Sequence, residues 1–360
     1  MRLLYEENLE HIATGAAVLG TGGGGDPYIG TLMAVDAVKK HGPIKLISID
    51  ELDEDDLVIP TAMMGAPVVL VEKLPTGNEF DAAFDSISKF MGSPVKATMS
   101  LEIGGMNSML PLATAAQYGL PIVDADGMGR AFPELQMVTQ TMYGISATPL
   151  FISDSKGNSG ILNTISNHWT ETFARSLTVD MGARAFIALY PATAGQLKES
   201  SILGSITLAE TIGRSIREAQ AANRDVVKVL CDSIGAFELF RGKVNDVERR
   251  TEGGFNRGEL KIAGIKAFEG DNYTVELQNE FLVAFKNGEV IASTPDLITL
   301  LNDDTGEPVT TEAVRYGARV VALGIPSNPQ WRKPEGLELV GPRYFGYDID
   351  YIPIEERQAG

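Results

Sequence analysis

Cysteine and basic residues are scarce in this sequence. Cys231 is the single cysteine among 360 residues, which excludes an internal disulfide framework. Lysine and arginine total 30 against 48 aspartates and glutamates, so the formal net charge is −18 at pH 7. Phosphate backbones and anionic membrane surfaces attract basic patches, and a chain of this charge repels them. We therefore expect neither nucleic acid nor a membrane as a partner.

Long hydrophobic runs are also missing. No apolar stretch approaches the roughly 18 residues that a membrane-spanning helix needs. Glu6 and Glu7 stand where a secretory signal would carry its apolar stretch, so we expect a cytoplasmic protein. The length exceeds what one hydrophobic core usually supports, and two domains are expected.

Histidine occurs three times, at His11, His41 and His168. The sequence has no H-E-x-x-H motif, no Cys/His cluster and no G-x-S-x-G elbow. A divalent metal would therefore have to bind His168 together with carboxylates such as Glu102, Asp124 or Asp126, and no cofactor is certain. His168 is also a candidate catalytic residue, because it falls near the start of a predicted helix, although a lone histidine is more often structural than catalytic.

The first half of the chain alternates helical and strand-like patterns. Apolar residues from Leu9 to Ala16 recur with helical spacing, and Asp26-Pro27 can begin a second helix that continues to Lys40. Short apolar runs then suggest strands: Ile44–Ile49, Leu57–Met63, Val68–Val71, Val95–Met99 and Pro121–Val123. This alternation predicts an α/β domain over residues 1–165, with a mostly parallel or mixed sheet.

The second half, residues 166–360, starts helical and becomes β-rich. One helix is predicted from near Asn167, and Thr207–Glu210 resembles a capping box that opens another. From Val226 onward strand-like runs predominate, and Asn287-Gly288 between two of them indicates a hairpin. Cys231 ends the first of these runs, where burial is favoured and a nucleophilic role stays open.

The stretch GTGGGGDP at residues 20–27 concentrates five glycines in six positions. A dinucleotide fingerprint requires a preceding strand, which the helical pattern before it does not supply. A helix C-cap needs only one glycine. We therefore favour a loop whose N–H groups hold an anionic or carbonyl-bearing part of a small ligand, together with the start of the next helix. The candidate binding residues are Gly22, Gly23, Gly24, Gly25 and Asp26.

Charged side chains follow two of the predicted strands. Asp124, Asp126 and Arg130 come after Pro121–Val123, while Glu102 and Asn107 come after Val95–Met99. Ligands of open α/β sheets lie at the carboxyl ends of strands, so these residues are candidates for catalysis and binding. Asp/Gly turns with ordinary caps would explain the same spacing.

A cluster of cations in the second half is a further candidate. Residues 241–258 gather several arginines in an acidic protein, and Arg257 could bind a carboxylate in a bidentate manner. Cross-strand ion pairs on a solvated hairpin are the favoured explanation of the cluster.

Seven segments together resemble one known family. They read LGTGGGGDP, EIGGMNS, DADGMGRAFPE, FRGKVNDVERRTEGGFNRG, QNEFLVAF, STPDLITLLNDDTGEP and VRYGARVVALG, and they extend over nearly the whole chain. The sequence is similar to the S-methyl thiohydantoin desulfurase family, whose members are often encoded beside hydantoinase/oxoprolinase proteins.

That resemblance implies a two-part protein that hydrolyses a small thiohydantoin or its S-methyl derivative to a hydantoin, releasing sulfide or methanethiol. Such chemistry needs a base for water and donors for the negative charge of the intermediate. Asp124, Asp126 or His168 could be the base, and the N–H groups of Gly22–Gly25 could be the donors.

Two other functions stay open at this point. One is a non-catalytic partner or regulatory subunit of a hydantoinase/oxoprolinase-type enzyme. The other is a nucleotide-binding protein, which the absence of lysine and arginine between His11 and Val38 disfavours. For any of these, we expect a homo-oligomer.

Overall fold

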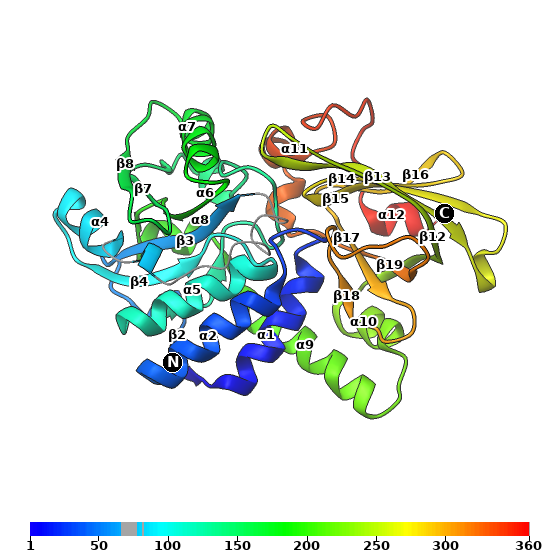
Figure 1. The fold of residues 1–360 in the computed structure, drawn as a ribbon, viewed down its shortest axis with the longest axis horizontal. Helices are drawn as coiled ribbons and strands as arrows, with labels where there is room; N and C mark the ends of the chain where they lie inside the picture. Colours follow the sequence, from blue (N-terminus) through cyan, green and yellow to red (C-terminus); the bar gives the residue numbers. More distant parts are fainter. Residues whose placement is uncertain (66–77, 81–82, 360) are drawn as a thin grey trace.

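The computed structural model describes residues 1–65, 78–80 and 83–359 (Figure 1). The predicted strand Val68–Val71 therefore lies outside the described residues. Among the helices of the described part, none is long and apolar enough to cross a membrane.

A mixed sheet forms the first half of the molecule. Within the described residues it has nine strands, in the order β1-β2-β5-β4-β3-β9-β7-β8, with β10 beside β3. The pairs β2–β5, β5–β4 and β4–β3 are parallel, and the remaining pairs are antiparallel. The mixed α/β sheet predicted from the sequence is confirmed. The strands are β1 Arg2–Leu4, β2 Ile44–Ile47, β3 Leu57–Gly65, β4 Val95–Ser100, β5 Ile122–Val123, β7 Leu150–Ser153, β8 Ser159–Leu162, β9 Arg184–Ala188 and β10 Ala192–Thr193.

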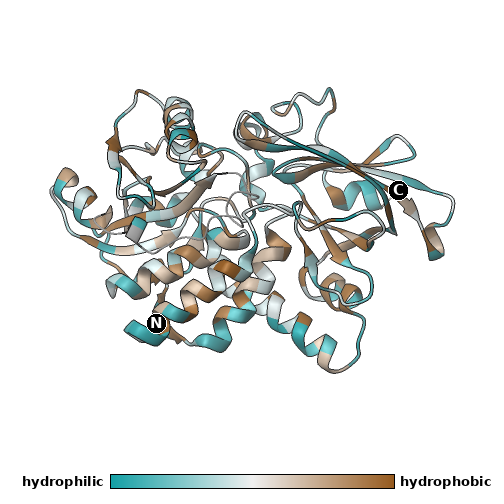
Figure 2. Cartoon of the chain, in the orientation of Figure 1, coloured by the Kyte–Doolittle hydropathy of each residue, from teal (hydrophilic) through white to brown (hydrophobic). Residues whose placement is uncertain are grey.

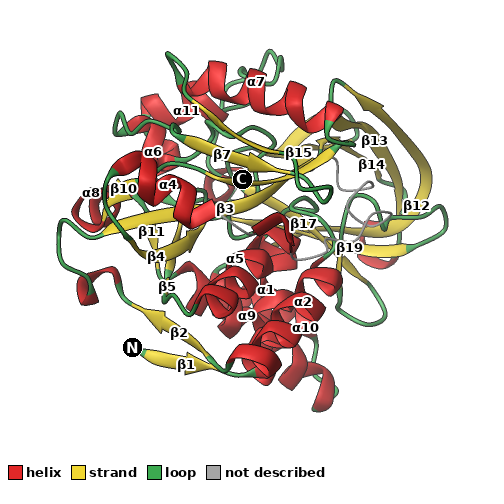
Figure 3. Ribbon diagram, turned by 60° about the vertical axis from the view of Figure 1, so that its left-hand side comes forward, coloured by secondary structure: helices red, strands yellow, loops and turns green. Residues whose placement is uncertain are grey.

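Helices cover both faces of this sheet. Figures 1 and 3 show α1, α2, α5 and α9 gathered on one side of β3 and β4, with α7 on the other. The helices of this half are α1 Glu6–Leu19, α2 Pro27–His41, α4 Ala83–Met91, α5 Gly105–Tyr118, α6 Thr139–Met142, α7 Asn167–Asp180, α8 Ala194–Ser200 and α9 Ser205–Ala221. A small ladder pairs β6 Ala125–Asp126 with β11 Ile202–Leu203, and 3₁₀ turns span Ile49–Glu51 and Asn78–Phe80.

An antiparallel sheet forms most of the second half, as the sequence predicted. Its order is β16-β15-β14-β13-β12-β19-β17-β18. The Asn287-Gly288 hairpin is confirmed between β15 and β16. The elements are α10 Val226–Ile234, β12 Phe237–Glu252, β13 Phe255–Gly264, β14 Asn272–Gln278, β15 Glu280–Lys286, β16 Glu289–Ser293, β17 Leu297–Asn302, β18 Pro308–Val309, β19 Arg319–Ile325, α11 Pro334–Val340 and α12 Ile354–Gln358, with 3₁₀ turns at Lys266–Phe268 and Pro329–Arg332.

The sequence signals for helix ends are partly confirmed. Asp26 caps α2 as predicted, since its side chain accepts the N–H of Tyr28 at 2.8 Å and Pro27 takes the first helical position. The capping box at Thr207 is wrong, because α9 begins at Ser205 and Gly204 occupies the cap position.

The run from Val226 to Leu230 is helical rather than strand-like. Asp225 caps α10 by accepting the N–H groups of Val227 and Lys228, and Gly235 ends the helix in the left-handed conformation. The buried positions in this helix, Val226, Val227 and Leu230, have helical spacing. Cys231 lies half-buried in α10, so it does not stand at the end of a strand.

One hydrophobic core joins the helices to the second sheet. It includes Leu9 and Ile12 of α1, Ile212 of α9, and Leu301 and Val321 from β17 and β19. Figure 2 shows hydrophobic residues on the inner parts of these helices and hydrophilic residues toward their outer ends. The helical layer therefore holds the two sheets together as one body.

The close crossing of α1 and α9 depends on two glycines. A Cβ on Gly15 would lie 1.8 Å from the carbonyl oxygen of Ala209, and one on Gly213 would lie 1.9 Å from that of His11. No side chain larger than hydrogen fits at either position unless the helices separate.

The first sheet continues beyond residue 165. Strand β9 comes later in the chain, yet it pairs between β3 and β7. The predicted division into residues 1–165 and 166–360 therefore does not coincide with the boundary between the two sheets. It stays a prediction.

Candidate active site

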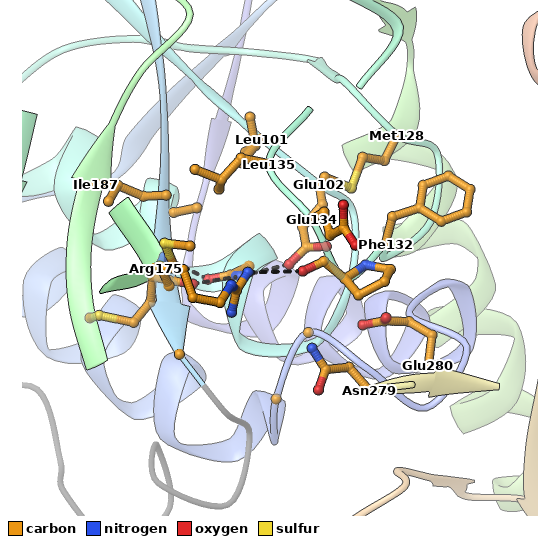
Figure 4. Close-up of a pocket in the computed structure, with 18 residues that line it drawn as sticks. Leu101, Glu102, Met128, Phe132, Glu134, Leu135, Arg175, Ile187, Asn279 and Glu280 are labelled. Carbon is orange, nitrogen blue, oxygen red and sulfur yellow. Dashed lines mark hydrogen bonds between the residues drawn. The ribbon is translucent and has the colours of Figure 1, made fainter. Parts of the chain in front are cut away.

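A small cavity lies where loops of the first sheet meet the second sheet, and it encloses about 50 Å³. Figure 4 shows Ile187 on one side of it and Glu102, Phe132 and Glu280 on the other. The lining residues are Gly24, Gly25, Ala62, Met63, Met64, Gly65, Leu101, Glu102, Asn107, Met128, Phe132, Pro133, Glu134, Leu135, Arg175, Ile187, Asn279 and Glu280. This volume exceeds what a single water needs, so the cavity has room for a small polar group.

Glu102 follows β4 and is 5% exposed. Its Oε1 atom accepts a hydrogen bond of 2.6 Å from the side-chain amide of Asn107, while its Oε2 atom has no partner among the described residues. Burial raises the pKa of Glu102 to about 7, and the hydrogen bond from Asn107 opposes that rise. At neutral pH this carboxyl therefore exists in both its protonated and its ionised form.

Glu280 begins β15 in the second sheet and is 2% exposed. Burial, and then the nearby charge of Glu102, raise the pKa of Glu280 well above its usual range; the charge of Arg130 and the N–H of Gly24 oppose this. Its Oε2 atom also lacks a hydrogen-bond partner in the described part of the chain. The two charges repel one another, so protonation of one carboxyl favours ionisation of the other.

Asn107 holds Glu102 in place. Its side-chain oxygen accepts the N–H of Met63 at 2.8 Å, and its amide nitrogen donates to the carbonyl of Met63 at 3.1 Å as well as to Glu102. The amide lines the cavity but is fully engaged by the protein. Asn107, predicted to bind substrate, therefore has the contacts of a positioning residue.

The glycine-rich loop packs against both carboxylate-bearing segments. The carbonyls of Gly24 and Gly25 accept the N–H groups of Asn107 and Met106, so the loop covers the start of α5. A Cβ on Gly24 would lie 2.3 Å from the carbonyl oxygen of Gly104. The close backbone approach that the glycines permit is therefore, at these positions, to the protein itself.

The N–H groups of this loop, predicted to face a ligand, are partly engaged by the protein. Gly23 donates to the carbonyl of Gly20 at 2.8 Å, and the N–H of Gly24 stabilises the ionised form of Glu280. Gly24 and Gly25 line the cavity, whereas Gly22 and Gly23 are not part of its lining. The carbonyl of Gly22 accepts the N–H of Thr311 at 2.9 Å, which anchors the loop to the second half of the chain.

Arg130 is fully buried and bonded to the protein on every side. Its guanidinium donates to the carbonyls of Ala131, Pro295 and Asp296 and to the hydroxyl of Thr21, each at 2.9 Å. Burial lowers the pKa of Arg130 to about 10, so the group is still charged at neutral pH. Predicted to bind substrate, Arg130 instead ties the glycine-rich loop to the second sheet and supplies a positive charge close to both carboxylates.

Asp124 and Asp126 do not join the cavity. Asp124 accepts the N–H groups of Ile206 and Thr207, each at 3.0 Å, and so caps α9 from a distant part of the chain. Asp126 is fully buried, and its Oδ2 atom accepts the N–H groups of Ile103, Met128 and Gly129. Burial raises the pKa of Asp126 to about 6. Both aspartates thus accept backbone N–H groups. This agrees with the alternative that the sequence left open, in which they belong to turns and helix caps.

The remaining predicted residues also lie outside the cavity lining. His168 is exposed on the first turn of α7, and Asp26 is engaged as the cap of α2. Arg257 lies in β13 with its guanidinium 5.7 Å from the ring of Phe255. The expected convergence of His168 with Glu102 and the two aspartates is therefore not found.

Glu280, Asn279 and Arg175 are site residues that sequence reasoning missed. Arg175 reaches the cavity from α7, pairs with Glu171, and stacks over the ring of Phe255 at 4.3 Å. Asn279 adopts a left-handed conformation with φ 59°, and its Nδ2 atom donates to none of the described residues. Asn279 and Glu280 lie in QNEFLVAF, one of the segments that resemble the family, so the resemblance did mark this region. No spacing in the sequence predicted that it would lie near Glu102.

The sequence left open whether the protein binds a divalent metal. Among the residues that the structure describes, no three His, Cys, Asp or Glu side chains come together as metal ligands.

The fold and the cavity define a two-sheet protein in which each sheet contributes one buried glutamate to a common site. Family models of the S-Me-THD-like N-terminal domain and of the S-Me-THD-like C-terminal domain match residues 7–164 and 165–354. The chain belongs to the S-Me-THD-like family, and the resemblance seen in the sequence is confirmed.

A solved structure supports the same fold. The crystal structure of a protein from Chromobacterium violaceum is similar, with a TM-score of 0.81 and 20% sequence identity over 98% of this chain and 100% of that chain. At this identity the likeness concerns the fold alone. No curated protein matches the chain.

Proposed function

We propose that this protein is a hydrolase that converts a small thiohydantoin, or its S-methyl derivative, to a hydantoin with release of sulfide or methanethiol. The observation that carries the proposal is the pair Glu102 and Glu280 at one cavity, each buried and each with an oxygen that has no hydrogen-bond partner among the described residues. Buried polar atoms without partners are uncommon in native proteins, and here both belong to groups able to move protons. Membership of the S-Me-THD-like family supports the substrate class.

The environments of the two carboxyls assign their roles. The Asn107 amide favours the ionised form of Glu102, whose pKa of about 7 suits a general base at neutral pH. Glu280, with the higher pKa, is the proton donor. A pair of carboxyls whose pKa values are pushed apart by their surroundings is a recurrent arrangement for acid–base catalysis.

The reaction then takes two steps on an S-methyl thiohydantoin. Water adds to the C2 carbon and passes one proton to Glu102, while Glu280 gives its proton to the ring nitrogen that shares the C2 double bond. In the second step the new hydroxyl returns a proton to Glu280, the carbon–sulfur bond breaks, and Glu102 transfers its proton to the departing methanethiolate. Both glutamates regain their starting forms, and the net reaction consumes one water.

Neighbouring groups assist these transfers. The amide nitrogen of Asn279, which donates to none of the described residues, is a donor for an oxygen or nitrogen of the ring. Met63, Met64, Leu101 and Ile187 form an apolar wall that limits access of further water. The charge of Arg130 stabilises the pair whenever one of the two carboxyls is ionised.

The test is thiol release from a panel of 2-thiohydantoins and S-methyl thiohydantoins, with and without a chelator. We expect Glu102→Gln and Glu280→Gln each to lower kcat/KM by about two to four orders of magnitude. Asp124→Asn is the matched control, because it removes a carboxylate that caps α9 outside the cavity. Full activity in both glutamine variants, or no thiol release from folded wild-type protein, would reject the proposal.

A further inference from the structure

Strand β8 is an open edge of the first sheet. It stands at the end of the strand order and pairs only with β7 among the described strands, as Figure 1 shows. The N–H of Asp154 donates to the carbonyl of Asn158, which fixes the alternation along the hairpin. By that alternation Gly160 and Leu162 bond to β7, while Ile161 directs its N–H and carbonyl to the open side.

Exposed apolar side chains surround this edge. The exposed fractions are 37% for Ile161, 92% for Ile165, 45% for Trp169 and 47% for Phe173. The rings of Trp169 and Phe173 lie 5.4 Å apart on the outer face of α7, which packs beside β8. We name these four residues the β8–α7 surface. Contiguous exposed apolar groups of this kind mark interaction sites.

The segment that forms this surface lacks acidic residues, lysine and arginine. No Asp, Glu, Lys or Arg occurs from Gly157 to Thr170, although these residues make up 22% of the chain. Exposed edge strands are commonly protected from other chains by lysine, proline or inward-pointing charge. Strand β8, Ser159–Leu162, has none of these protections. The segment is therefore open to pairing.

We infer that the β8–α7 surface binds a second copy of this chain. Two β8 strands would pair antiparallel across a two-fold axis, with Ile161 facing Ile161 of the second copy, and the apolar groups of both α7 helices would flank the pair. Antiparallel pairing of identical strands is self-complementary, as a two-fold interface requires. The net charge of −18 makes two copies repel one another over most of their surface, and this neutral segment is where they can meet.

Two substitutions test the pairing directly. Ile161→Pro removes the N–H on the open side and leaves the β7–β8 hydrogen bonds, which use Gly160 and Leu162. Trp169→Glu places a negative charge on the same surface without altering the strand. It provides the test if the proline variant fails to fold. The matched control is Phe90→Glu, because Phe90 is a similarly exposed aromatic residue, at 54%, on α4.

The measurement is sedimentation velocity of the full chain over a hundredfold range of concentration, with circular dichroism to confirm folding. We expect wild type and Phe90→Glu to be dimers, and Ile161→Pro and Trp169→Glu to be folded monomers at the same concentrations. Oxidation of Ile161→Cys in a Cys231→Ser background should also link two chains covalently, since paired strands bring facing Cα atoms within disulfide range. A monomeric wild type, or dimers that persist in both folded variants, would overturn the inference.

Discussion

Gly23 of the glycine-rich loop faces the carboxylate of Glu280, although the two residues are 257 positions apart in the chain. A Cβ added to Gly23 would lie 1.9 Å from the Oε1 atom of Glu280. The loop therefore sets the position of one member of the carboxyl pair, and its lack of side chains is what allows the contact.

Gly23→Ala should reduce activity more than stability. The added methyl meets the flexible end of Glu280, which can move away at small energetic cost, but a displacement of about 1 Å at a reacting group can lower the rate about a hundredfold. We expect kcat/KM to fall by about that factor, with a thermal midpoint close to wild type. A variant of unchanged activity would contradict the role of the loop in positioning Glu280.

Gly24→Ala offers the contrasting case. Gly24 has φ 73°, and its added Cβ would meet the backbone carbonyl of Gly104 at 2.3 Å, which cannot swing aside. The loss should therefore appear in the free energy of unfolding, by about 1 kcal/mol for the left-handed backbone alone and more for the clash. Urea denaturation of the two alanine variants side by side measures this difference.

The first half of the chain was the more predictable from sequence. Asp26-Pro27 and the apolar spacing before it are local signals, and they placed α1 and α2 correctly. The run at Val226 was misjudged because a short apolar run suits a buried helix or a strand, and the deciding cap at Asp225 was overlooked.

The candidate site was predictable only in part. Strand ends and a glycine-rich loop selected Glu102, Asn107, Gly24 and Gly25, and these four residues line one cavity. Glu280 could not be placed with them, because its approach depends on how the second sheet docks on the helices, and no periodicity in the sequence encodes that contact. Asp124 and Asp126 had the right residue type at a strand end, yet one oxygen of each, Oδ1 of Asp124 and Oδ2 of Asp126, accepts backbone N–H groups, and neither residue lines the cavity.

Stability should depend on pH through Glu102. Its pKa rises from an ordinary 4.5 to about 7 on folding, so the folded protein binds more protons than the unfolded chain between these values. The free energy of unfolding should therefore fall as the pH is raised from about 5 through about 7. Glu280, whose pKa is raised still further, should continue this fall at higher pH. Asp126, with a pKa of about 6, contributes a slope of the same sign.

Glu102→Gln isolates that dependence. Glutamine keeps the shape of the side chain and cannot ionise, so urea titrations across this pH range should give a shallower slope than wild type. An identical slope in the two proteins would show that Glu102 does not carry the proton.

Asp126→Ala should act on folding. The substitution removes the acceptor of three N–H groups; those of Ile103 and Met128 are buried, and that of Gly129 is partly buried. At about 1 to 3 kcal/mol for each buried unsatisfied group, the loss of stability should be at least about 2 kcal/mol. Activity per folded molecule, measured below the new melting temperature, should stay within about tenfold of wild type, because Asp126 lies outside the cavity lining. A rate loss of several orders of magnitude in folded protein would instead restore Asp126 as the base.

Each sheet contributes one glutamate of the candidate site, Glu102 after β4 and Glu280 at the start of β15. The proposed activity would therefore depend on how the sheets dock, because a fragment that holds only one sheet retains one glutamate without the other. Separation of the sheets by even a small movement would let water reach both carboxyls and return them to ordinary acidity. By holding the sheets together, the helical layer thus keeps Glu102 and Glu280 buried and maintains their raised pKa values.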